Sequence, residues 1–151
     1  VLPLDGLRTS RSLRRSLRRY EVRMDSSFRS GMEACADPSR SGAWINRQFV
    51  DAYERLHELG WAHSIEIHEP ATGAMVGGLY GVQIGRLFAG ESMFHTATDA
   101  SKVALVHLVD WLRATGGSLL DVQWRTDHLA TLGVIEIPRS EYLERLREAV
   151  A

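Results

Sequence analysis

Alternation of apolar and polar positions predicts a set of strands in the first two thirds of the chain. Between residues 20 and 25, Tyr, Val and Met alternate with Glu, Arg and Asp, which is the period of a half-buried strand. Residues 62–68 and 74–82 are also strand-like and flank a Glu-Pro-Ala-Thr-Gly turn, so they predict a hairpin. Residues 86–89 predict a third antiparallel strand. This part of the chain therefore predicts an antiparallel sheet.

Apolar residues that recur at intervals of three and four predict two long helices. One covers residues 44–59 and ends at Gly60, where a left-handed cap is expected. The other begins near Thr98 or Asp99, either of which can cap it, and ends at the glycine pair 116–117. These are the longest helices that the sequence predicts.

Shorter elements complete the pattern. A helical turn or two is expected after residues 26–27, with Phe28 and Met32 facing inward. The other predicted elements are a strand at 118–123, a helix at 127–132, a strand at 134–137 and a helix at 140–150. This order predicts an α+β fold, with a mixed, mostly antiparallel sheet flanked by helices. It resembles the acyltransferase fold of acetyl-CoA-dependent N-acetyltransferases.

Length and composition narrow the class of protein. The 151 residues suffice for one domain, and 44% hydrophobic and 25% charged residues are typical of a globular chain. The single cysteine, Cys35, excludes an internal disulfide and favours a reducing compartment, so a cytoplasmic location is expected. No apolar stretch approaches the roughly 20 residues that span a bilayer. We therefore expect a protein without membrane contact and take it to be a monomer. Because the first residue is Val, the sequence leaves open whether the chain is a piece of a longer protein.

The net charge of -1 conceals a basic amino-terminal segment at 1–19, followed by a single, more acidic domain at 20–151. The arginines of this segment recur at three and four, which on a helix would gather most of them on one side, although the serines between them disfavour a stable helix. They are Arg8, Arg11, Arg14, Arg15, Arg18 and Arg19. Two interpretations stay open: contact with nucleic acid phosphates, or a solvated basic face that meets another partner.

Five of the thirteen glycines lie between residues 77 and 90, where the sequence otherwise reads as strand. Glycine weakens a strand unless a bulge or a closely approaching ligand needs the space, and both explanations stay open. The spacing from Gly85 to Ser92 imitates a phosphate-binding loop, but Glu91 stands where that loop requires Lys. We therefore exclude nucleotide hydrolysis.

Glu91 is a carboxylate among apolar neighbours, with Phe88, Met93 and Phe94 nearby in the sequence. Such a group must find a hydrogen-bond donor or shift its pKa. It either forms an ion pair with a nearby arginine that fixes a loop, or binds a cationic amine beside an apolar side-chain pocket. The sequence does not decide between the two.

Asp121 and Gln123 are two residues apart in a predicted strand, so we expect them to share a face. They are either core hydrogen-bonding residues that fix a loop, or a reactive pair. In a reactive pair, Asp121 orients the Gln123 amide, whose oxygen accepts a proton from an attacking amine. Cysteine, histidine and serine show no convincing catalytic or metal-ligand spacing, so no metal is expected.

Several strings follow one another along the chain in a specific order. They are Ser-Arg-Ser-Leu-Arg-Arg at 10–15, Ala-Tyr-Glu-Arg-Leu-His-Glu-Leu-Gly at 52–60, Ala-His-Ser-Ile-Glu at 62–66, Val-Gly-Gly-Leu-Tyr-Gly-Val at 76–82, Gly-Glu-Ser-Met-Phe at 90–94, Ala-Ser-Lys at 100–102 and Asp-Val-Gln at 121–123. Together they resemble the leucyl/phenylalanyl-tRNA-protein transferase family over residues 7–146.

The resemblance implies a bacterial N-degron enzyme with an N-acetyltransferase-like catalytic domain at 20–151. It implies transfer of Leu or Phe from Leu-tRNA or Phe-tRNA to proteins that begin with Arg or Lys. No cofactor is expected, because aminoacyl-tRNA is a co-substrate.

The resemblance also implies roles for individual residues. Trp44 and Tyr53 would hold the terminal adenosine and its neighbouring groups. Glu91 would lie at the reaction centre, where Asp121 and Gln123 would assist attack by the acceptor amine. The pocket for the transferred aminoacyl group would comprise Leu79, Phe88, Ser92 and Met93. The six arginines of the basic segment would contact the tRNA acceptor stem.

Two departures from the family pattern accompany the resemblance. Family members carry an additional amino-terminal region, rich in aromatic residues, and this chain starts after it. Leu79 stands where some relatives have Met. Two other functions therefore stay open: an acetyl-CoA-dependent N-acetyltransferase, whose Gln/Arg-x-x-Gly-x-Gly/Ala turn is not evident here, and a tRNA-binding remnant without catalysis.

Overall fold

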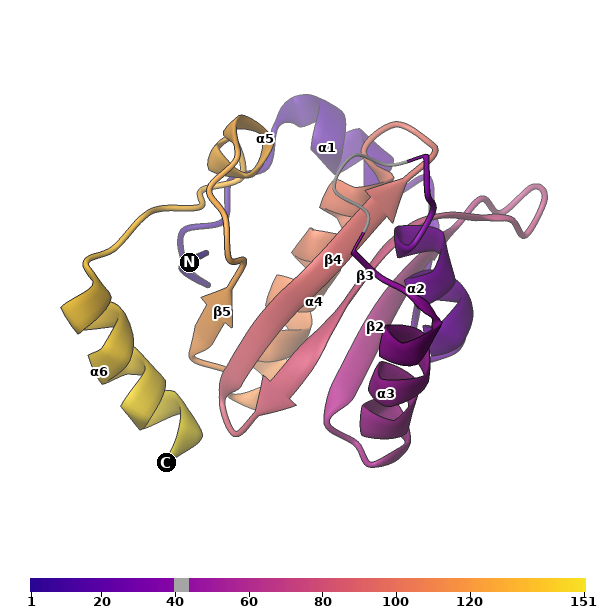
Figure 1. Ribbon diagram of the computed structural model, residues 1–151. Helices are drawn as coiled ribbons and strands as arrows, with labels where there is room; N and C mark the ends of the chain where they lie inside the picture. The colour runs from indigo at the N-terminus through magenta and orange to yellow at the C-terminus, as the bar shows by residue number, and fades with distance from the viewer. Residues whose placement is uncertain (40–43) are drawn as a thin grey trace.

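The computed structural model describes residues 1–39 and 44–151 (Figure 1). In these ranges one sheet has the strand order β1-β2-β3-β4-β5. The strands are β1 (Glu21–Met24), β2 (Ala62–His68), β3 (Met75–Ile84), β4 (Leu87–His95) and β5 (Leu119–Asp121). Neighbours are antiparallel from β1 to β4, whereas β5 pairs parallel to β4. The predicted mixed, mostly antiparallel sheet is confirmed.

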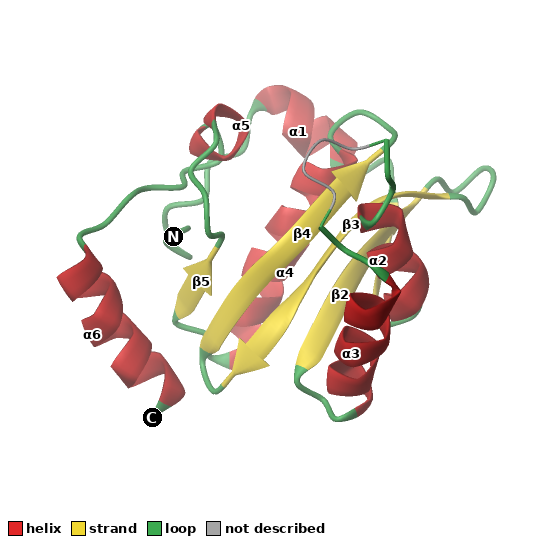
Figure 2. Ribbon diagram, viewed as in Figure 1, coloured by secondary structure: helices red, strands yellow, loops and turns green. Residues whose placement is uncertain are grey.

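Helices cover both faces of the sheet (Figure 2). Helix α4 (Ala100–Thr115) packs on one face, and α2 (Phe28–Cys35) and α3 (Arg47–Glu58) pack on the other. Helices α1 (Arg11–Ser16) and α5 (Asp127–Ala130) lie at the end of the sheet where β4 ends, and α6 (Arg139–Val150) lies beside β5. Within the described ranges, no helix is both long and apolar enough to cross a membrane.

The side-chain alternation of the strands explains the two layers. On β3, Leu79 joins the core beneath α4, whereas the next residue, Tyr80, joins the core beneath α2 and α3. The basic segment contributes to the first of these cores, because Leu2 and Leu13 are both only 1% exposed within it. The arginines of this segment are therefore attached to the body of the fold.

Caps account for two helix boundaries that differ from the sequence prediction. Helix α3 begins three residues later than predicted, because the Asn46 side chain accepts the Phe49 N–H at 3.1 Å and caps the helix. Helix α1 does form in the basic segment. The serines of this segment were expected to disfavour a helix, but Ser10 caps its start, because its side chain accepts the Leu13 N–H at 3.0 Å.

Near the carboxyl end, one predicted strand does not form and another is shorter than predicted. Residues 134–137 form no strand: Ile135 exchanges two backbone hydrogen bonds with Val1, and Pro138 follows closely. The strand predicted at 118–123 ends at Asp121, because the chain turns through a positive φ of 65° at Gln123. In contrast, β4 is longer than the predicted 86–89 and continues to His95.

The protein itself accounts for much of the glycine pattern between residues 77 and 90. A Cβ on Gly77 would lie 2.5 Å from the Cβ of Ala100 at the start of α4. A Cβ on Gly81 would collide with the Phe88 ring and the Ala89 carbonyl. One of the two expected explanations is confirmed, since the ladder pairs Tyr80 with Ser92 and Gly81 with Gly90 and so leaves Glu91 as a bulge.

Candidate functional site

A hollow opens where β4 and β5 separate. The two strands pair only from Leu87 to Ala89 on β4, after which β5 ends while β4 continues. The hollow has a volume of about 420 Å³, and we call it the β4–β5 hollow. It is lined by Leu79, Tyr80, Gly90, Glu91, Ser92, Met93, Leu105, Leu108, Leu120, Val122, Trp124, Thr126 and Leu129. Its lining is mostly apolar, with Glu91 as the one carboxylate.

Gln123 bridges the two separating segments. Its side-chain Nε2 donates to the Gly90 carbonyl on β4 at 2.9 Å, next to Glu91. In the reactive-pair interpretation, Asp121 was expected to orient the Gln123 side-chain amide directly. Its Oδ1 instead accepts the backbone N–H of Gln123 at 2.8 Å. The Tyr142 hydroxyl donates to Asp121 Oδ2 at 2.7 Å. Asp121 thus fixes the turn that places the Gln123 amide.

The Gln123 amide has one hydrogen-bonding atom to spare. Its nitrogen donates to Gly90, so its Oε1 points away from that bond and carries two lone pairs. Within residues 1–39 and 44–151, Oε1 accepts no hydrogen bond, and the residue is exposed. The arrangement offers an oriented acceptor at the edge of the β4–β5 hollow.

Glu91 is half-buried and is linked to Tyr53 of α3. Burial, followed by the charge of Glu91 and a hydrogen bond to it, raises the pKa of Tyr53 to about 12. The Tyr53 ring also packs edge-on against Tyr80, with 5.5 Å between centroids. In the described part of the chain, no Arg or Lys forms an ion pair with Glu91. Tyr53 therefore supplies a hydrogen-bond donor to Glu91, where the first interpretation expected an arginine.

The structure brings together only some of the residues expected in the aminoacyl and adenosine pocket. Leu79, Ser92 and Met93 line the β4–β5 hollow. Phe88 does not: it is fully buried and packs against Trp111 beneath the sheet. Trp44 lies ahead of α3, 44% exposed, with its ring edge-on to Phe49.

The sequence missed several residues of the hollow. Leu105 and Leu108 of α4 form part of it, although their spacing predicts only an inward-facing helix stripe. Trp124 also lines it and is 77% exposed. Helical spacing identifies core residues but carries no signal for where two strands separate, so these residues could not be assigned from the sequence.

The six arginines of the basic segment are all exposed. Arg19 is engaged, because it pairs with Glu69 at 3.1 Å and lies over the Tyr20 ring. The other five form no ion pair within the described ranges. Helix α1 is tied to the start of α4, since the Ser16 hydroxyl donates to Asp99 Oδ2 at 2.9 Å. The basic face therefore adjoins the loop between β4 and α4.

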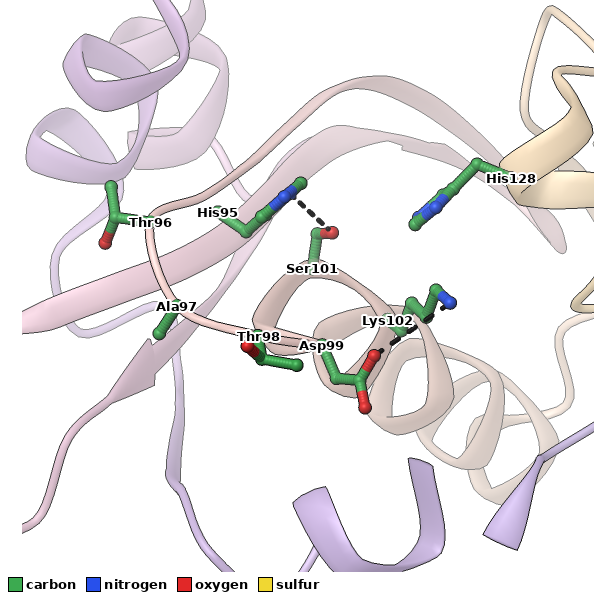
Figure 3. Close-up of a pocket in the computed structure, with 8 residues that line it drawn as sticks. All are labelled: His95, Thr96, Ala97, Thr98, Asp99, Ser101, Lys102 and His128. Carbon is green, nitrogen blue, oxygen red and sulfur yellow. Dashed lines mark hydrogen bonds and ion pairs between the residues drawn. The ribbon is translucent and has the colours of Figure 1, made fainter. Parts of the chain in front are cut away.

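A second hollow of about 400 Å³ lies at this loop (Figure 3). His95 and Ser101 are joined by a 3.2 Å hydrogen bond, and the His128 ring reaches in from α5, parallel to His95. Burial and the charge of Lys102 lower the pKa of His128. Asp99 lies at the mouth in a left-handed conformation, 3.9 Å from Lys102, and makes no side-chain cap bond to α4.

Asp99 bears on the acetyl-CoA alternative. A pyrophosphate at the start of a helix needs free backbone N–H groups and no competing negative charge. Here a carboxylate occupies the helix start, and no glycine-rich turn precedes it. The residues of this hollow do not fit the pyrophosphate of acetyl-CoA.

Comparison with solved structures defines the class of fold. A probable acetyltransferase superposes with a TM-score of 0.64 at 8% identity, covering 78% of this chain and 91% of that one. Glucosamine-6-phosphate N-acetyltransferase from Arabidopsis thaliana gives a TM-score of 0.54 at 11% identity, covering 79% and 93%. The chain has the N-acetyltransferase fold.

Sequence comparison gives the family. The profile of the leucyl/phenylalanyl-tRNA protein transferase family matches residues 1–147. A leucyl/phenylalanyl-tRNA–protein transferase from Cereibacter sphaeroides is 53% identical over 152 residues, which are 99% of this chain and 69% of the relative. The chain belongs to the leucyl/phenylalanyl-tRNA protein transferase family and spans about two thirds of that relative's length.

Proposed function

We propose that this chain transfers Leu or Phe from aminoacyl-tRNA to the α-amine of proteins that begin with Arg or Lys. Family membership supports the class of reaction, an aminoacyl-tRNA–protein transfer. The observation that carries the proposal is the Gln123 amide, which Gly90 and Asp121 fix in place and whose oxygen accepts no hydrogen bond within the described ranges.

The proposed chemistry is direct attack of the acceptor amine on the aminoacyl ester. The amine nitrogen forms a bond to the ester carbonyl carbon, and the bond from that carbon to the ribose oxygen breaks. The proton lost by the amine passes by way of Gln123 Oε1 to the ribose oxygen, which leaves as a hydroxyl. An amide is a weak base, so positioning contributes more than proton affinity. Glu91 binds the α-ammonium of the aminoacyl group.

The β4–β5 hollow is proposed to hold the transferred side chain. Leu79, Met93, Leu105 and Leu108 give it apolar walls, and Met adapts its shape readily. One methylene changes binding by only about 1–3 kcal/mol in such a pocket, so both Leu and Phe are accepted. Tyr53, linked to Glu91, is proposed to contact the adjoining terminal adenosine.

The exposed arginines of the basic segment are proposed to bind the tRNA acceptor stem. They adjoin the loop at Asp99, so a backbone that crosses α1 passes close to the start of α4. We further propose that the reaction tags proteins for degradation in the bacterial cytoplasm.

A donor panel tests the proposed function. The chain is incubated with an Arg-initiated peptide and one labelled donor: Leu-tRNA, Phe-tRNA, Ala-tRNA or acetyl-CoA. We expect label in the peptide from Leu-tRNA and Phe-tRNA, and little from the other two, because a methyl side chain fills the hollow poorly. Transfer from acetyl-CoA alone would contradict the proposal, and tRNA binding without transfer would identify a binding remnant.

A further inference from the structure

The hollow at the loop between β4 and α4 is a neighbour of the β4–β5 hollow, and we call it the β4–α4 hollow (Figure 3). Residues two apart on a strand share a face and lie about 7 Å apart, so adjacent positions of one element can line both cavities. Strand β4 and helices α4 and α5 each contribute to both hollows. The corresponding pairs are Met93 and His95, Leu105 and Lys102, and Leu129 and His128.

The β4–α4 hollow also adjoins the basic segment. The Ser16 hydroxyl of α1 donates at 2.9 Å to Asp99 Oδ2, and Asp99 lines the hollow. The Tyr20 hydroxyl, just after the segment, donates at 2.8 Å to the carbonyl of Thr98 in the same loop. The hollow is thus next to the arginines proposed to bind the acceptor stem and next to the cavity proposed to hold the aminoacyl group. A tRNA strand that joins these two sites runs past it.

The charges of the β4–α4 hollow favour an anion. Lys102 supplies a permanent positive charge and the two histidines supply titratable ones, against the single carboxylate of Asp99. That carboxylate is already engaged, by the Ser16 hydroxyl and, at 3.9 Å, by Lys102. Burial, then the charges of Lys102 and His95, lower the pKa of His128, and the opposing effect of Asp99 is the smallest. The local field is therefore positive, and it attracts a negative ligand.

The hollow also has donors for the oxygens of such a ligand. Ser101 is buried, and a 3.2 Å hydrogen bond between its hydroxyl and His95 Nδ1 fixes the His95 ring. Nε2 is then the nitrogen left for a ligand, and it carries a proton whenever the ring is charged. The His128 ring lies parallel to that of His95, with 6.5 Å between centroids. Two imidazoles and the Lys102 ammonium around one cavity suit a phosphate group.

We propose that the β4–α4 hollow binds one phosphate of the single-stranded 3′ end of tRNA, through Lys102, His95 and His128. Asp99 covers the start of α4, so the phosphate lies at the imidazoles and not at the helix end. This inference rests on the proposed function for its ligand. It assigns binding roles to two histidines that the family resemblance leaves without one.

Binding at this hollow depends on pH. His128 faces His95 from β4 and both Lys102 and Asp99 from α4, whereas its own neighbour Asp127 does not line the hollow. Among these groups, only the histidines change charge between pH 6 and pH 8. A bound phosphate favours the charged imidazoles, so binding takes up protons and becomes tighter as the pH falls. The arginines of α1 stay charged throughout, which separates their contribution from that of the hollow.

Filter binding of tRNA that carries no amino acid tests the assignment without any need for transfer. Affinity is measured at pH 6 and pH 8, each at several salt concentrations, for the unaltered chain and for His95→Gln, His128→Gln and Lys102→Gln. Both histidines are exposed, so neither substitution alters the core. His107→Gln is the matched control, because His107 is a half-buried histidine of α4 that lines neither hollow.

We expect the unaltered chain to bind tRNA about three- to tenfold more tightly at pH 6 than at pH 8. Each of His95→Gln and His128→Gln should bring this ratio below about twofold, and the control should leave it unchanged. Lys102→Gln should reduce the slope of log affinity against log salt concentration by about 1 at both pH values. A ratio near one in the unaltered chain would overturn the assignment, as would a ratio that survives both histidine substitutions or is also lost in the control.

NMR of the unaltered chain tests the source of the phosphate. The imidazole signals of His95 and His128, assigned with the two Gln variants, are followed at pH 6 during titration with the cytidine-cytidine-adenosine trinucleotide that ends tRNA. A separate titration uses inorganic phosphate. We expect the trinucleotide to shift both signals at a concentration about tenfold lower than inorganic phosphate does. Equal concentrations would identify a site for free phosphate and overturn the tRNA assignment, and so would the absence of any shift.

Failure of this inference and failure of the proposed function give different results. A chain that transfers Leu, but binds tRNA equally well without the two histidines, retains the proposed function and overturns the phosphate site. A chain that binds tRNA through the histidines but transfers nothing retains the phosphate site and contradicts the proposed function.

Discussion

At the scale of residues, Gln123 joins the two segments that separate beside the β4–β5 hollow. Gln123 adopts a positive φ, which an L-residue rarely does, and is held there by Asp121 on its backbone and Gly90 on its side chain. A strained residue that its surroundings fix in place is a typical functional-site feature. Asp121 and Gln123 could be identified from the sequence as a polar pair. The hydrogen bond from the Gln123 backbone to Asp121 could not be predicted, because the alternation of a strand does not continue through a turn.

Burial of the Tyr53 phenol, and secondarily the charge of Glu91, raises its pKa and makes the stability of the fold depend on pH. Its folded-state pKa of about 12 lies above the unfolded value near 10, so the neutral phenol stabilises the fold fully below about pH 10. This stabilisation is lost as the pH rises toward 12. We expect the unfolding free energy, measured by urea titration, to fall more steeply between pH 10 and 12 for the unaltered chain than for Tyr53→Phe. Parallel curves would show that Tyr53 does not have a raised pKa.

Helix α1 is the element that we assign to tRNA. Replacing Arg14 and Arg15 by Ala should weaken binding of Leu-tRNA and reduce the slope of log affinity against log salt concentration by about 1 to 2. Filter binding at several salt concentrations measures this slope. Arg113→Ala, in the last turn of α4, is the matched control and should leave the slope unchanged. A slope that is also unchanged for the α1 variant would place the tRNA elsewhere.

The contact between β3 and α4 depends on Gly77. An added Cβ would meet Ala100 at 2.5 Å, so Gly77→Ala should lower the unfolding free energy by about 1–3 kcal/mol through overpacking. Urea denaturation measures the change. The double variant Gly77→Ala with Ala100→Gly should recover part of the loss, because it removes the methyl group that is hit. If Gly77→Ala is as stable as the unaltered chain, α4 moves away from β3 without a cost in free energy, and the contact at Gly77 is not tight.

Most elements could be predicted from the sequence because each follows a local rule. The hairpin of β2 and β3 has alternation and a turn, and α4 has a stripe of apolar residues and a terminal glycine at Gly116. The segment at 134–137 has the same alternation, but it forms no strand; Ile135 bonds to Val1 and Val134 to Leu129 instead. A strand needs a partner in space, which its own residues do not specify.

The chain has an N-acetyltransferase fold, and its β4–β5 hollow lies where the parallel strand separates from the sheet. The element order was sufficient to predict this architecture, since strands and helices can bury their apolar faces against one another in only a few layered arrangements. It was not sufficient to predict the hollow, which results from β5 ending at Asp121 while β4 continues to His95. The aminoacyl residues Leu79 and Met93 could be named from the resemblance, whereas Leu105, Leu108 and Trp124 required the structure.

The most direct test of the account is the single-turnover rate of Leu transfer from bound Leu-tRNA to a saturating Arg-initiated peptide, compared between the unaltered chain and Gln123→Ala. We expect a rate about 100-fold lower for the variant, because the proposed acceptor Oε1 is lost. Its affinity for Leu-tRNA should stay within about twofold, because Gln123 does not line the β4–β5 hollow. Equal rates in the two proteins would contradict the account.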